Sequence, residues 1–258
     1  MPLKLNAASR KLIIRYLSNF FPLYIVTEHP KSGGTWVSQM VAEYLRVPFP
    51  RNRMPIWGSQ VMHTHDIGLE GQKYIFVVLR DGRDVMVSYY YHSLFYNDLY
   101  NARHVDRVRQ RIQFDDHEDI RANLSRFIDL LNDKGHYPRL TWRDFTEYWL
   151  ERGDVGFLRY ERLLADCMAE MTQAVEKVIG KKVDQDRLAP IIERFSFANQ
   201  AKRMAGEDVK TSWLRKGIAG DWKNVFSREA AVTFDRLAGE TLIRAGYEPD
   251  HSWVEGVI

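Results

Sequence analysis

The chain has one cysteine in 258 residues, Cys167, which excludes an internal disulfide and a cysteine-rich metal site. A lone thiol is typical of a reducing compartment, so we expect a cytoplasmic protein in which Cys167 is a packing residue. No uninterrupted apolar stretch reaches the length that a bilayer-spanning helix needs. Repeats, low-complexity tracts and Pro/Gly/Ser linkers are lacking as well, so we expect a single domain over residues 1–258.

Neither basic nor acidic residues are in large excess. Lys and Arg number 37 against 34 Asp and Glu, a formal net charge of +3. Such a balance is not that of a protein that coats a polyanion, and no nucleic-acid partner is expected. What the chain does contain is apolar residues, 45% of the total, which suffice for the core of one large α/β domain.

A basic amphipathic helix is predicted near the N-terminus. An apolar stripe at helical spacing is formed by Leu12, Ile13, Tyr16, Leu17 and Phe20, with Arg10, Lys11 and Arg15 elsewhere around the helix. Arg15 interrupts the apolar run, which leads directly into a predicted strand at 23–26, so a cleaved signal peptide is disfavoured. We expect the stripe to pack on the sheet, and weak attachment to a membrane surface is the alternative.

The segment PLYIVTEHPKSGGTW, residues 22–36, joins a short apolar strand to an apolar helix through a polar glycine turn. A helix N-terminus there points its N–H groups outward, and glycines let the backbone approach an anion closely. Lys31 adds a positive charge, and Ser32 and Thr35 add hydroxyl donors. An ordinary turn would explain the glycines but not these three side chains together, so we predict a phosphate or sulfate site. A Walker A loop is excluded because Lys31 precedes Gly33 and Gly34.

Two further segments repeat the pattern of strand, polar turn and helix. The run YIFVVL at 74–79 is apolar throughout, as in a strand buried on both faces, and leads to Arg80. A third strand is predicted at 155–160, ahead of another helix. Three such units predict an α/β fold with a central, mostly parallel β-sheet flanked by helices, whose ligands bind at the carboxyl ends of the strands.

Two histidines lie in a short extended segment, VMHTHDIG at 61–68. Period-two spacing places His63 and His65 on one face of a strand and Asp66 on the other. A metal ion would require a third ligand on the same face, so acid–base chemistry is favoured and no metal is expected.

Two other stretches leave alternatives open. Residues 92–140 are rich in polar residues, with helical periodicity around 105–112 and 120–131. Such a segment is usually a solvated insertion, and a lid or an acceptor-binding element is the alternative. Near the C-terminus, the basic glycine-bearing segment 214–226 suits a second anionic group, and a solvated loop anchored by Trp222 is an equal alternative.

Together, HPKSGGTW at 29–36, RDGRDVMVS at 80–88 and RKGIAGDWKNVF at 215–226 resemble the signature set of sulfotransferases that use 3′-phosphoadenosine 5′-phosphosulfate (PAPS), in matching order over essentially the whole chain. The resemblance is to the cytosolic-type enzymes and their compact bacterial relatives. It implies a P-loop-like nucleotide-binding architecture, PAPS as the sulfuryl donor and adenosine 3′,5′-bisphosphate (PAP) as the product.

The resemblance also implies roles at matching positions. The loop that holds the 5′-phosphosulfate would consist of Lys31, Ser32, Gly33, Gly34, Thr35 and Trp36. The 3′-phosphate would be bound by Arg80, Ser88, Arg215, Lys216 and Gly217. The adenine pocket would be lined by Trp36, Tyr160 and Phe197. His65 matches the catalytic base of the family.

Three departures from the family's pattern carry information. His63 stands where the family often has lysine, so either protonated His63 assists the leaving group or Lys31 acts alone. Gly34 replaces a common threonine, which removes one hydroxyl donor. Of the family's dimer motif only Lys223 is present, so that dimer is doubtful and the oligomeric state stays open.

Sulfuryl transfer accounts for these residue types. Lys31 would neutralise charge on the departing phosphate oxygens, and an imidazole such as His65 is suited to remove a proton from an attacking hydroxyl. We predict O-sulfotransfer without a metal to a small-molecule or glycan acceptor, with a carbohydrate, a phenol or another small alcohol as the acceptor class. The alternatives are an ATP- and magnesium-dependent phosphoryl-transfer enzyme and a non-catalytic nucleotide-binding or membrane-peripheral module.

Overall fold

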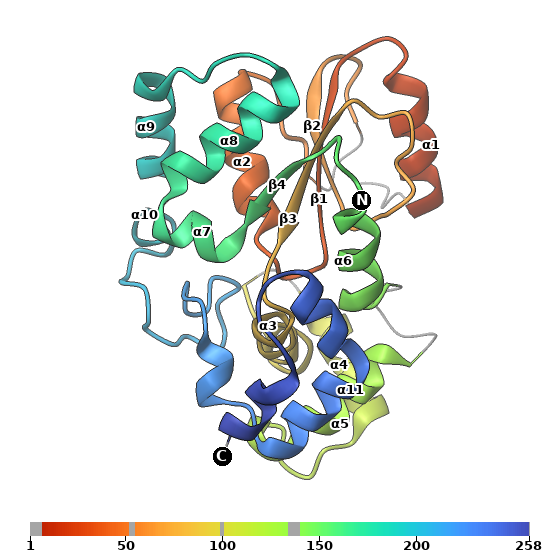
Figure 1. Cartoon of the computed structure of the whole chain (residues 1–258), viewed down its shortest axis with the longest axis vertical. Coiled ribbons are helices and arrows are strands. Elements are labelled where there is room, and N and C mark those ends of the chain that lie inside the picture. The colour runs from red at the N-terminus through yellow and green to blue at the C-terminus, as the bar shows by residue number, and fades with distance from the viewer. Residues whose placement is uncertain (1–6, 52–54, 99–100, 134–139, 258) are drawn as a thin grey trace. The chain divides into compact units, whose positions relative to one another are not determined.

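The computed structural model describes residues 7–51, 55–98, 101–133 and 140–257, and Figure 1 gives the course of the chain. Its contacts group into two compact units. One consists of Met1–Leu79 and Tyr148–Gln200, the other of Arg80–Glu147 and Ala201–Ile258. Among the described residues, no helix combines the length and the apolar character needed to cross a membrane.

The first unit is built on a four-stranded parallel sheet with strand order β2-β1-β3-β4. The strands are β1 (Leu23–Glu28), β2 (Gln60–Thr64), β3 (Tyr74–Leu79) and β4 (Gly156–Arg159). All residues of β3 after Tyr74 are buried, as its uninterrupted apolar run predicts. The predicted α/β class with a parallel sheet flanked by helices is therefore confirmed.

Two helices pack on this sheet, α2 (Gly34–Leu45) and α8 (Cys167–Ile179), and α9 (Gln185–Arg194) packs against both of them. The apolar layer between helices and strands includes Val26, Val37, Phe76, Leu158, Met171 and Leu188. Cys167 is partly buried and packs against this layer, with Sγ 3.9 Å from Sδ of Met40, and its burial raises the pKa of its thiol to about 12. A thiol so protonated is unreactive, in agreement with the predicted packing role. The same unit includes α1 (Ala7–Leu17), α7 (Tyr160–Ala165) and most of α10 (Phe197–Ala201).

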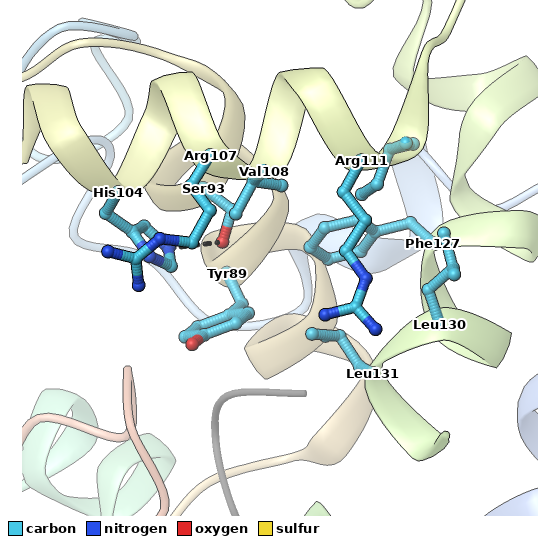
Figure 2. Close-up of a pocket in the computed structure, with 10 residues that line it drawn as sticks. Tyr89, Ser93, His104, Arg107, Val108, Arg111, Phe127, Leu130 and Leu131 are labelled. Atoms are coloured by element: carbon cyan, nitrogen blue, oxygen red, sulfur yellow. Dashed lines mark hydrogen bonds between the residues drawn. The ribbon is translucent and has the colours of Figure 1, made fainter. Parts of the chain in front are cut away.

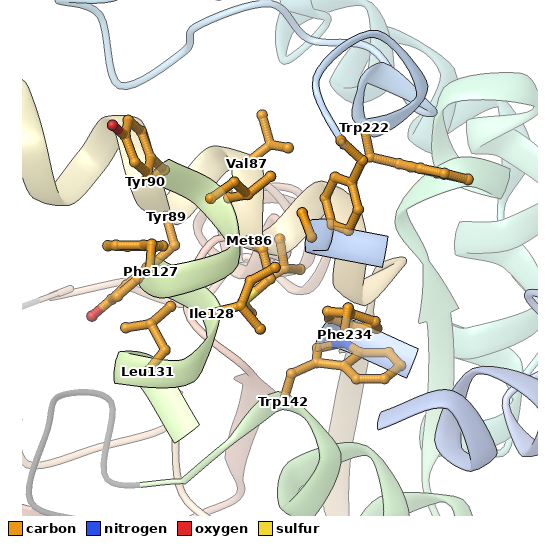
Figure 3. Packing of buried hydrophobic residues seen from close by; sticks show 14 of the residues in the cluster. Met86, Val87, Tyr89, Tyr90, Phe127, Ile128, Leu131, Trp142, Trp222 and Phe234 are labelled. Atoms are coloured by element: carbon orange, nitrogen blue, oxygen red, sulfur yellow. The ribbon is translucent and has the colours of Figure 1, made fainter. Parts of the chain in front are cut away.

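The second unit is helical. Its elements are α3 (Gly82–Leu94), α4 (Ala102–Ile112), α5 (Ile120–Asn132), η1 (Asp221–Asn224), α11 (Arg228–Arg244) and η2 (His251–Gly256), and α6 (Trp142–Leu150) begins in it. Figure 3 shows its aromatic core, which includes Tyr89, Phe127, Trp142, Trp222 and Phe234. Close packing requires a glycine at the start of α3, because a Cβ on Gly82 would lie 2.6 Å from the rings of Trp142 and Phe234.

Residues 92–140 are not a solvated insertion where the structure describes them. Helices α4 and α5 fall where the periodicity predicts them, and their apolar residues, such as Ile112 and Phe127, are buried in the core of the second unit. The polarity of the whole segment did not decide between the alternatives, because a helix buries only one face. Trp222 is 6% exposed, so it anchors its loop, as one of the two alternatives for this segment had it.

The N-terminal apolar stripe does not pack as a whole. Ile14 and Leu17 are buried, whereas Leu12 is 70% exposed and Tyr16 and Phe20 are each 56% exposed. The buried line runs through residues three apart, and Tyr16 and Phe20, four apart, lie on the adjacent face. Trp57, 66% exposed, packs beside them, with ring centroids 6.4 Å from Tyr16 and 5.6 Å from Phe20. The predicted packing of the stripe is therefore wrong for its outer residues.

Candidate functional site

The predicted anion turn joins β1 to α2 in the first unit. Its backbone passes through the left-handed region at Lys31 (φ 78°) and Gly33 (φ 101°) before α2 begins at Gly34. For a non-glycine residue such a conformation costs on the order of 1–3 kcal/mol, and such positions cluster at functional sites. Gly33 has a second constraint, because a Cβ there would lie 2.9 Å from the ring of Tyr160.

Two hydrogen-bond donors of this turn are buried without a partner among the residues that the structure describes: Ser32 Oγ and Trp36 Nε1. Ser32 is only 1% exposed. Buried polar atoms are normally hydrogen-bonded, so a hydroxyl in this state suits a ligand oxygen. The N–H groups that follow Gly34 in the first turn of α2 add further donors, because helix geometry gives them no partner within the helix.

A buried carboxylate that the sequence analysis missed lies beside the turn. Glu28, the last residue of β1, accepts a hydrogen bond from the Gly34 N–H through Oε2 (2.5 Å), and its Oε1 lies 3.0 Å from His63 Nε2. Burial raises the pKa of Glu28, but the hydrogen bond and charge of His63, the charge of His65 and the Gly34 N–H outweigh it, so the pKa is lowered. Glu28 is therefore ionised. Its only signal in the sequence was an acidic residue ending an apolar strand.

The two histidines lie together, as their spacing predicts. β2 pairs with β1 so that His63 is opposite Val26, and the ring centroids of His63 and His65 are 4.9 Å apart. His65 follows the end of β2, and its Nδ1 lies 3.1 Å from the main-chain oxygen of Glu28. A carbonyl oxygen only accepts, so Nδ1 carries a proton, and Nε2 is the nitrogen of the neutral imidazole that takes up another.

Asp66 is hydrogen-bonded to two threonines. Its Oδ2 accepts a hydrogen bond from the Thr64 hydroxyl at 2.6 Å, and its main-chain oxygen accepts one from the Thr27 hydroxyl at 2.9 Å. The third possible metal ligand beside the two histidines is Glu28. One ligating atom from each of Glu28, His63 and His65 lies within 4.8 Å of the other two, so this group could hold a metal ion. Both Glu28 oxygens already have hydrogen-bond partners, which favours the acid–base interpretation.

The aromatic residues predicted for an adenine pocket belong to the same unit. Tyr160, the first residue of α7, borders the turn, and its ring centroid lies 6.2 Å from that of Trp36 at an interplanar angle of 75°. Phe197 is the first residue of α10 and is half-buried. An edge-to-face pair such as Trp36 and Tyr160 offers π-faces on which a planar base can stack.

The residues predicted to bind a second phosphate belong to the second unit. Arg80 precedes α3, donates from Nη2 to the main-chain oxygen of Ile218 (3.3 Å) and lies 3.9 Å from Asp84. Ser88 is in α3. The structure describes every residue of α3, and only Ser88 and His92 are not buried. Ser88 therefore lies on the partly exposed side of this helix. Arg83 is a structural cation, since its guanidinium stacks 3.7 Å from the Trp222 ring.

The basic loop of this unit is organised by two aspartates. Asp221 accepts hydrogen bonds from Arg215 (2.5 Å) and Lys216 (2.7 Å), and Asp208 accepts one from Arg215 (2.9 Å). Burial raises the pKa of Asp221, but the two cations outweigh it and lower the pKa below its ordinary value. Gly217 follows in the left-handed region, with φ 65°. The structure thus brings Arg215 and Lys216 to one carboxylate, a cluster of donors that also suits a phosphate.

A cavity of about 180 Å³ also lies within the second unit, between α3, α4 and α5 (Figure 2). Its walls are apolar, and its polar lining consists of Ser93, His104, Arg107 and Arg111. The Ser93 hydroxyl and His104 Nε2 are 3.3 Å apart, and burial, with the nearby charge of Arg107, lowers the pKa of His104. Apolar walls with a few polar groups are typical of small-molecule sites.

Comparison with known proteins gives a consistent picture. The chain matches the family model described as "Sulfotransferase domain" over residues 63–246, a range that begins after the turn. Sulfotransferase 1E1 of Cavia porcellus is 23% identical over 269 residues, covering 84% of each chain. The 3-beta-hydroxysteroid sulfotransferase of Cavia porcellus is also 23% identical, covering 87% of this chain and 84% of its own. The mouse sulfotransferase SULT7A1, solved as a complex with PAP, has a TM-score of 0.62 at 18% identity, covering 95% of this chain and 92% of its own, so the two share a fold.

Proposed function

Because the chain belongs to the sulfotransferase domain family, we propose that it catalyses O-sulfotransfer, moving a sulfuryl group from PAPS to an acceptor hydroxyl roughly in line, with His65 as general base. The observation that carries this proposal is the contact of His65 Nδ1 with the main-chain oxygen of Glu28, at 3.1 Å. Because a carbonyl oxygen only accepts, Nδ1 is the donor of this bond, and Nε2 is the ring nitrogen that can take the hydroxyl proton. An imidazole suits this task near neutral pH.

On this proposal the turn Lys31–Trp36 binds the 5′-phosphosulfate. The buried Ser32 hydroxyl and the N–H groups that follow Gly34 in the first turn of α2 donate to its oxygens, and Lys31 neutralises charge on the departing phosphate. Bound PAPS supplies the activated sulfuryl group. Trp36, Tyr160 and Phe197 take the adenine. The ring pair of Trp36 and Tyr160 and the orphaned Ser32 hydroxyl support this assignment.

Residues of the second unit would take the 3′-phosphate, namely Arg80, Ser88, Arg215, Lys216 and Gly217. The convergence of two of these cations on Asp221 supports this, because a phosphate offers them similar acceptors. The family match runs through both units, so we propose that residues 1–258 act as one sulfotransferase domain with a P-loop-like turn. No metal takes part in the proposed reaction.

For the acceptor we propose a small hydroxylated molecule, such as a carbohydrate, a phenol or another small alcohol. The name of one relative, a hydroxysteroid sulfotransferase, supports a hydroxyl as the accepting group. A screen of acceptor classes for transfer of labelled sulfate tests this proposal. We expect transfer to at least one of these three classes, and labelling confined to amine acceptors would reject O-sulfotransfer.

We also propose weak attachment to a membrane surface through an aromatic patch, defined as Leu12, Tyr16, Phe20 and Trp57, in a cytoplasmic protein. The exposure of all four side chains and the exposed Arg15 beside them support this, because aromatic rings with neighbouring cations favour a lipid interface. The compartment rests on the chain's single cysteine, Cys167.

Thermal unfolding with and without nucleotides tests the donor. A saturating ligand that binds only the folded protein stabilises it by about 2.7 kcal/mol at one hundred times its Kd. We expect such a shift with PAP in the absence of magnesium and little with ATP. A shift with ATP and magnesium alone would instead support a phosphoryl-transfer enzyme.

A further inference from the structure

The cavity between α3, α4 and α5 follows from what α4 presents to its neighbours. The buried residues of α4 are Val105 and Ile112. The stretch between them lines the cavity with the short Val108 and with Arg107 and Arg111, whose charged ends favour water over an apolar core. A space of about 180 Å³ is therefore left unfilled. Protein interiors normally contain few voids larger than a water molecule, so a space of this size suits a ligand.

The size and lining of the cavity suit one small ring. An apolar cavity of about 150 Å³ stays dry and holds benzene. A space of about 180 Å³ thus has room for one six-membered ring with a small substituent. Tyr89 of α3 and Phe127 of α5 both line it, with ring centroids 6.4 Å apart, so a bound ring would have aromatic neighbours on two helices. A nucleotide is larger and more polar than this space allows.

Two cations lie at the mouth of the cavity. Arg107 and Arg111 line it and are nevertheless exposed to solvent. In Figure 2 both side chains extend from α4 to the same side as Tyr89 and Leu131. Within the part of the chain that the structure describes, no carboxylate forms an ion pair with either guanidinium. Two such guanidinium groups suit a carboxylate or sulfate group of a ligand.

The polar pair inside the cavity is uncharged near pH 7. Ser93 is 1% exposed, and its hydroxyl lies 3.3 Å from His104 Nε2. Burial, and to a lesser extent the charge of Arg107, lowers the pKa of His104, so its ring is mostly neutral at that pH. A hydroxyl donates one hydrogen bond and accepts two, so Ser93 can also bond to a polar atom of a ligand. The positive charge of the described lining therefore comes from the two arginines.

We propose that this cavity is a binding site for a small aromatic anion, a compound with one six-membered ring and one carboxylate or sulfate group. The ring enters the space beside Tyr89 and Phe127, and the anionic group lies at the mouth between Arg107 and Arg111. The site is independent of the proposed sulfotransfer, because none of its residues is among those predicted to bind PAPS or to act as the base.

An NMR titration with four probes tests the class of ligand. The methyl signals of Val108, Leu130 and Leu131, which line the cavity, report binding at this site. Benzoate and phenyl sulfate carry a ring and a charge, phenol lacks the charge, and inorganic sulfate lacks the ring. We expect both aromatic anions to shift these signals, and phenol and inorganic sulfate to bind about tenfold more weakly or not at all. The tighter of the two aromatic anions identifies the anionic group that the site takes.

Two results of this titration would overturn the proposal. One is that neither benzoate nor phenyl sulfate shifts the three methyl signals, even if other signals of the protein move. The other is that phenol binds as tightly as benzoate, because the two arginines would then contribute nothing to recognition.

A double variant tests the arginines. Arg107→Gln combined with Arg111→Gln should raise the Kd for benzoate about tenfold or more, because it removes charge-assisted hydrogen bonds, and should leave the affinity for phenol unchanged. Arg126→Gln combined with Arg228→Gln is the matched control, since it removes the same charge from two exposed positions that do not line the cavity. Equal weakening in the two double variants would show a general effect of charge and overturn the site.

A variant that fills the cavity tests the place of the ring. Val108→Phe should abolish binding of every aromatic probe without lowering the thermal unfolding midpoint, because filling a cavity generally stabilises a fold. Retained binding of benzoate would overturn the proposal. Stabilisation by PAP should be the same in all these variants as in the wild type. If benzoate binds while PAP does not stabilise the protein and no sulfate is transferred, the proposed function fails and the cavity site stands. Transfer of sulfate without binding of either aromatic anion refutes the cavity site alone.

Discussion

Asp84 accepts a hydrogen bond from the backbone N–H of Gly220, with Oδ2 2.7 Å from the nitrogen. Its other oxygen, Oδ1, accepts from the Trp222 N–H at 2.9 Å. Asp84 belongs to the motif that begins at Arg80, and Gly220 belongs to the basic motif 215–226. The two residues are 136 positions apart in the sequence. One buried carboxylate therefore connects the two motifs that carry the predicted 3′-phosphate residues.

Replacing Asp84 with alanine should destabilise the second unit. The variant leaves the buried N–H of Trp222 and the partly buried N–H of Gly220 without this acceptor, and the loss of a buried partner costs about 1–3 kcal/mol. Urea unfolding measures the free energy, and PAP titration measures the effect on the basic loop. Asp129→Ala is the control, because Asp129 pairs with Arg236 at an exposed position and should cost less than about 1 kcal/mol. Equal losses in the two variants would contradict the connecting role of Asp84.

Replacing His65 with alanine should abolish transfer without loss of nucleotide binding. A general base is worth about 10²- to 10⁴-fold in rate, so kcat should fall within that range. Thermal stabilisation by PAP should persist because the turn is unchanged. His251→Ala, at an exposed position in η2, should have wild-type activity. Near-normal kcat in His65→Ala would show that another group removes the proton.

A methyl group at residue 34 should be poorly tolerated. Gly34→Ala places its Cβ against Glu28 and His63, and overpacking of this kind costs about 1–3 kcal/mol. Gly153→Ala is the matched control, because nothing lies within 4 Å of a Cβ there and its φ is not in the left-handed region. Unfolding midpoints measure both. If Gly34→Ala were as stable as Gly153→Ala, the steric link between Gly34 and Glu28 would be refuted.

The stability contributed by Asp221 should depend on pH. Its pKa is lowered in the folded protein, so the carboxylate stabilises the fold above its ordinary pKa of 3.8. That contribution is lost as pH falls through the lower folded-state value. We therefore expect the difference in unfolding free energy between wild type and Asp221→Asn to be largest at pH 7 and to shrink below about pH 4. A difference independent of pH would show that the charge is not responsible.

The aromatic patch predicts lipid binding that depends on exposed rings. Phe20→Ser combined with Trp57→Ser should reduce co-sedimentation with vesicles that contain anionic phosphatidylserine, with little loss of stability, since both side chains are largely exposed. Val232→Ser, which removes a 51% exposed apolar side chain from α11, is the control. If wild type and double variant bound vesicles equally, membrane attachment through this patch would be excluded.

Much of the fold was predictable because its signals are local. Strand β3 lies at the apolar run 74–79, and helices α4 and α5 lie at the periodic segments 105–112 and 120–131. The spacing of apolar residues predicts these elements because it shows whether one face or the whole segment is buried. Spacing alone did not reveal which line of α1 is buried. Ile14 and Leu17 are buried and Tyr16 is exposed because of the surface against which the helix packs.

For the candidate site, the residue types that bind anions and move protons were recognisable from motifs, and the family assignment followed from their order along the chain. The partners of those residues were not recognisable. Glu28 and His63 are 35 positions apart, and nothing near either residue indicates the other. They meet because β1 and β2 pair in parallel, which places His63 opposite Val26 and beside the end of β1.

The sequence by itself therefore determined the chemistry that is available: a lysine and hydroxyl turn at a helix start, two histidines at strand spacing and a basic glycine loop. Only the tertiary structure decided which groups these residues contact. Strand pairing brought a buried carboxylate to His63 and a carbonyl to His65, and it left no space for a side chain at Gly34. The physical reason is that charge state and tautomer depend on atoms within about 3 Å, and such neighbours come from strand register rather than from neighbouring positions in the sequence.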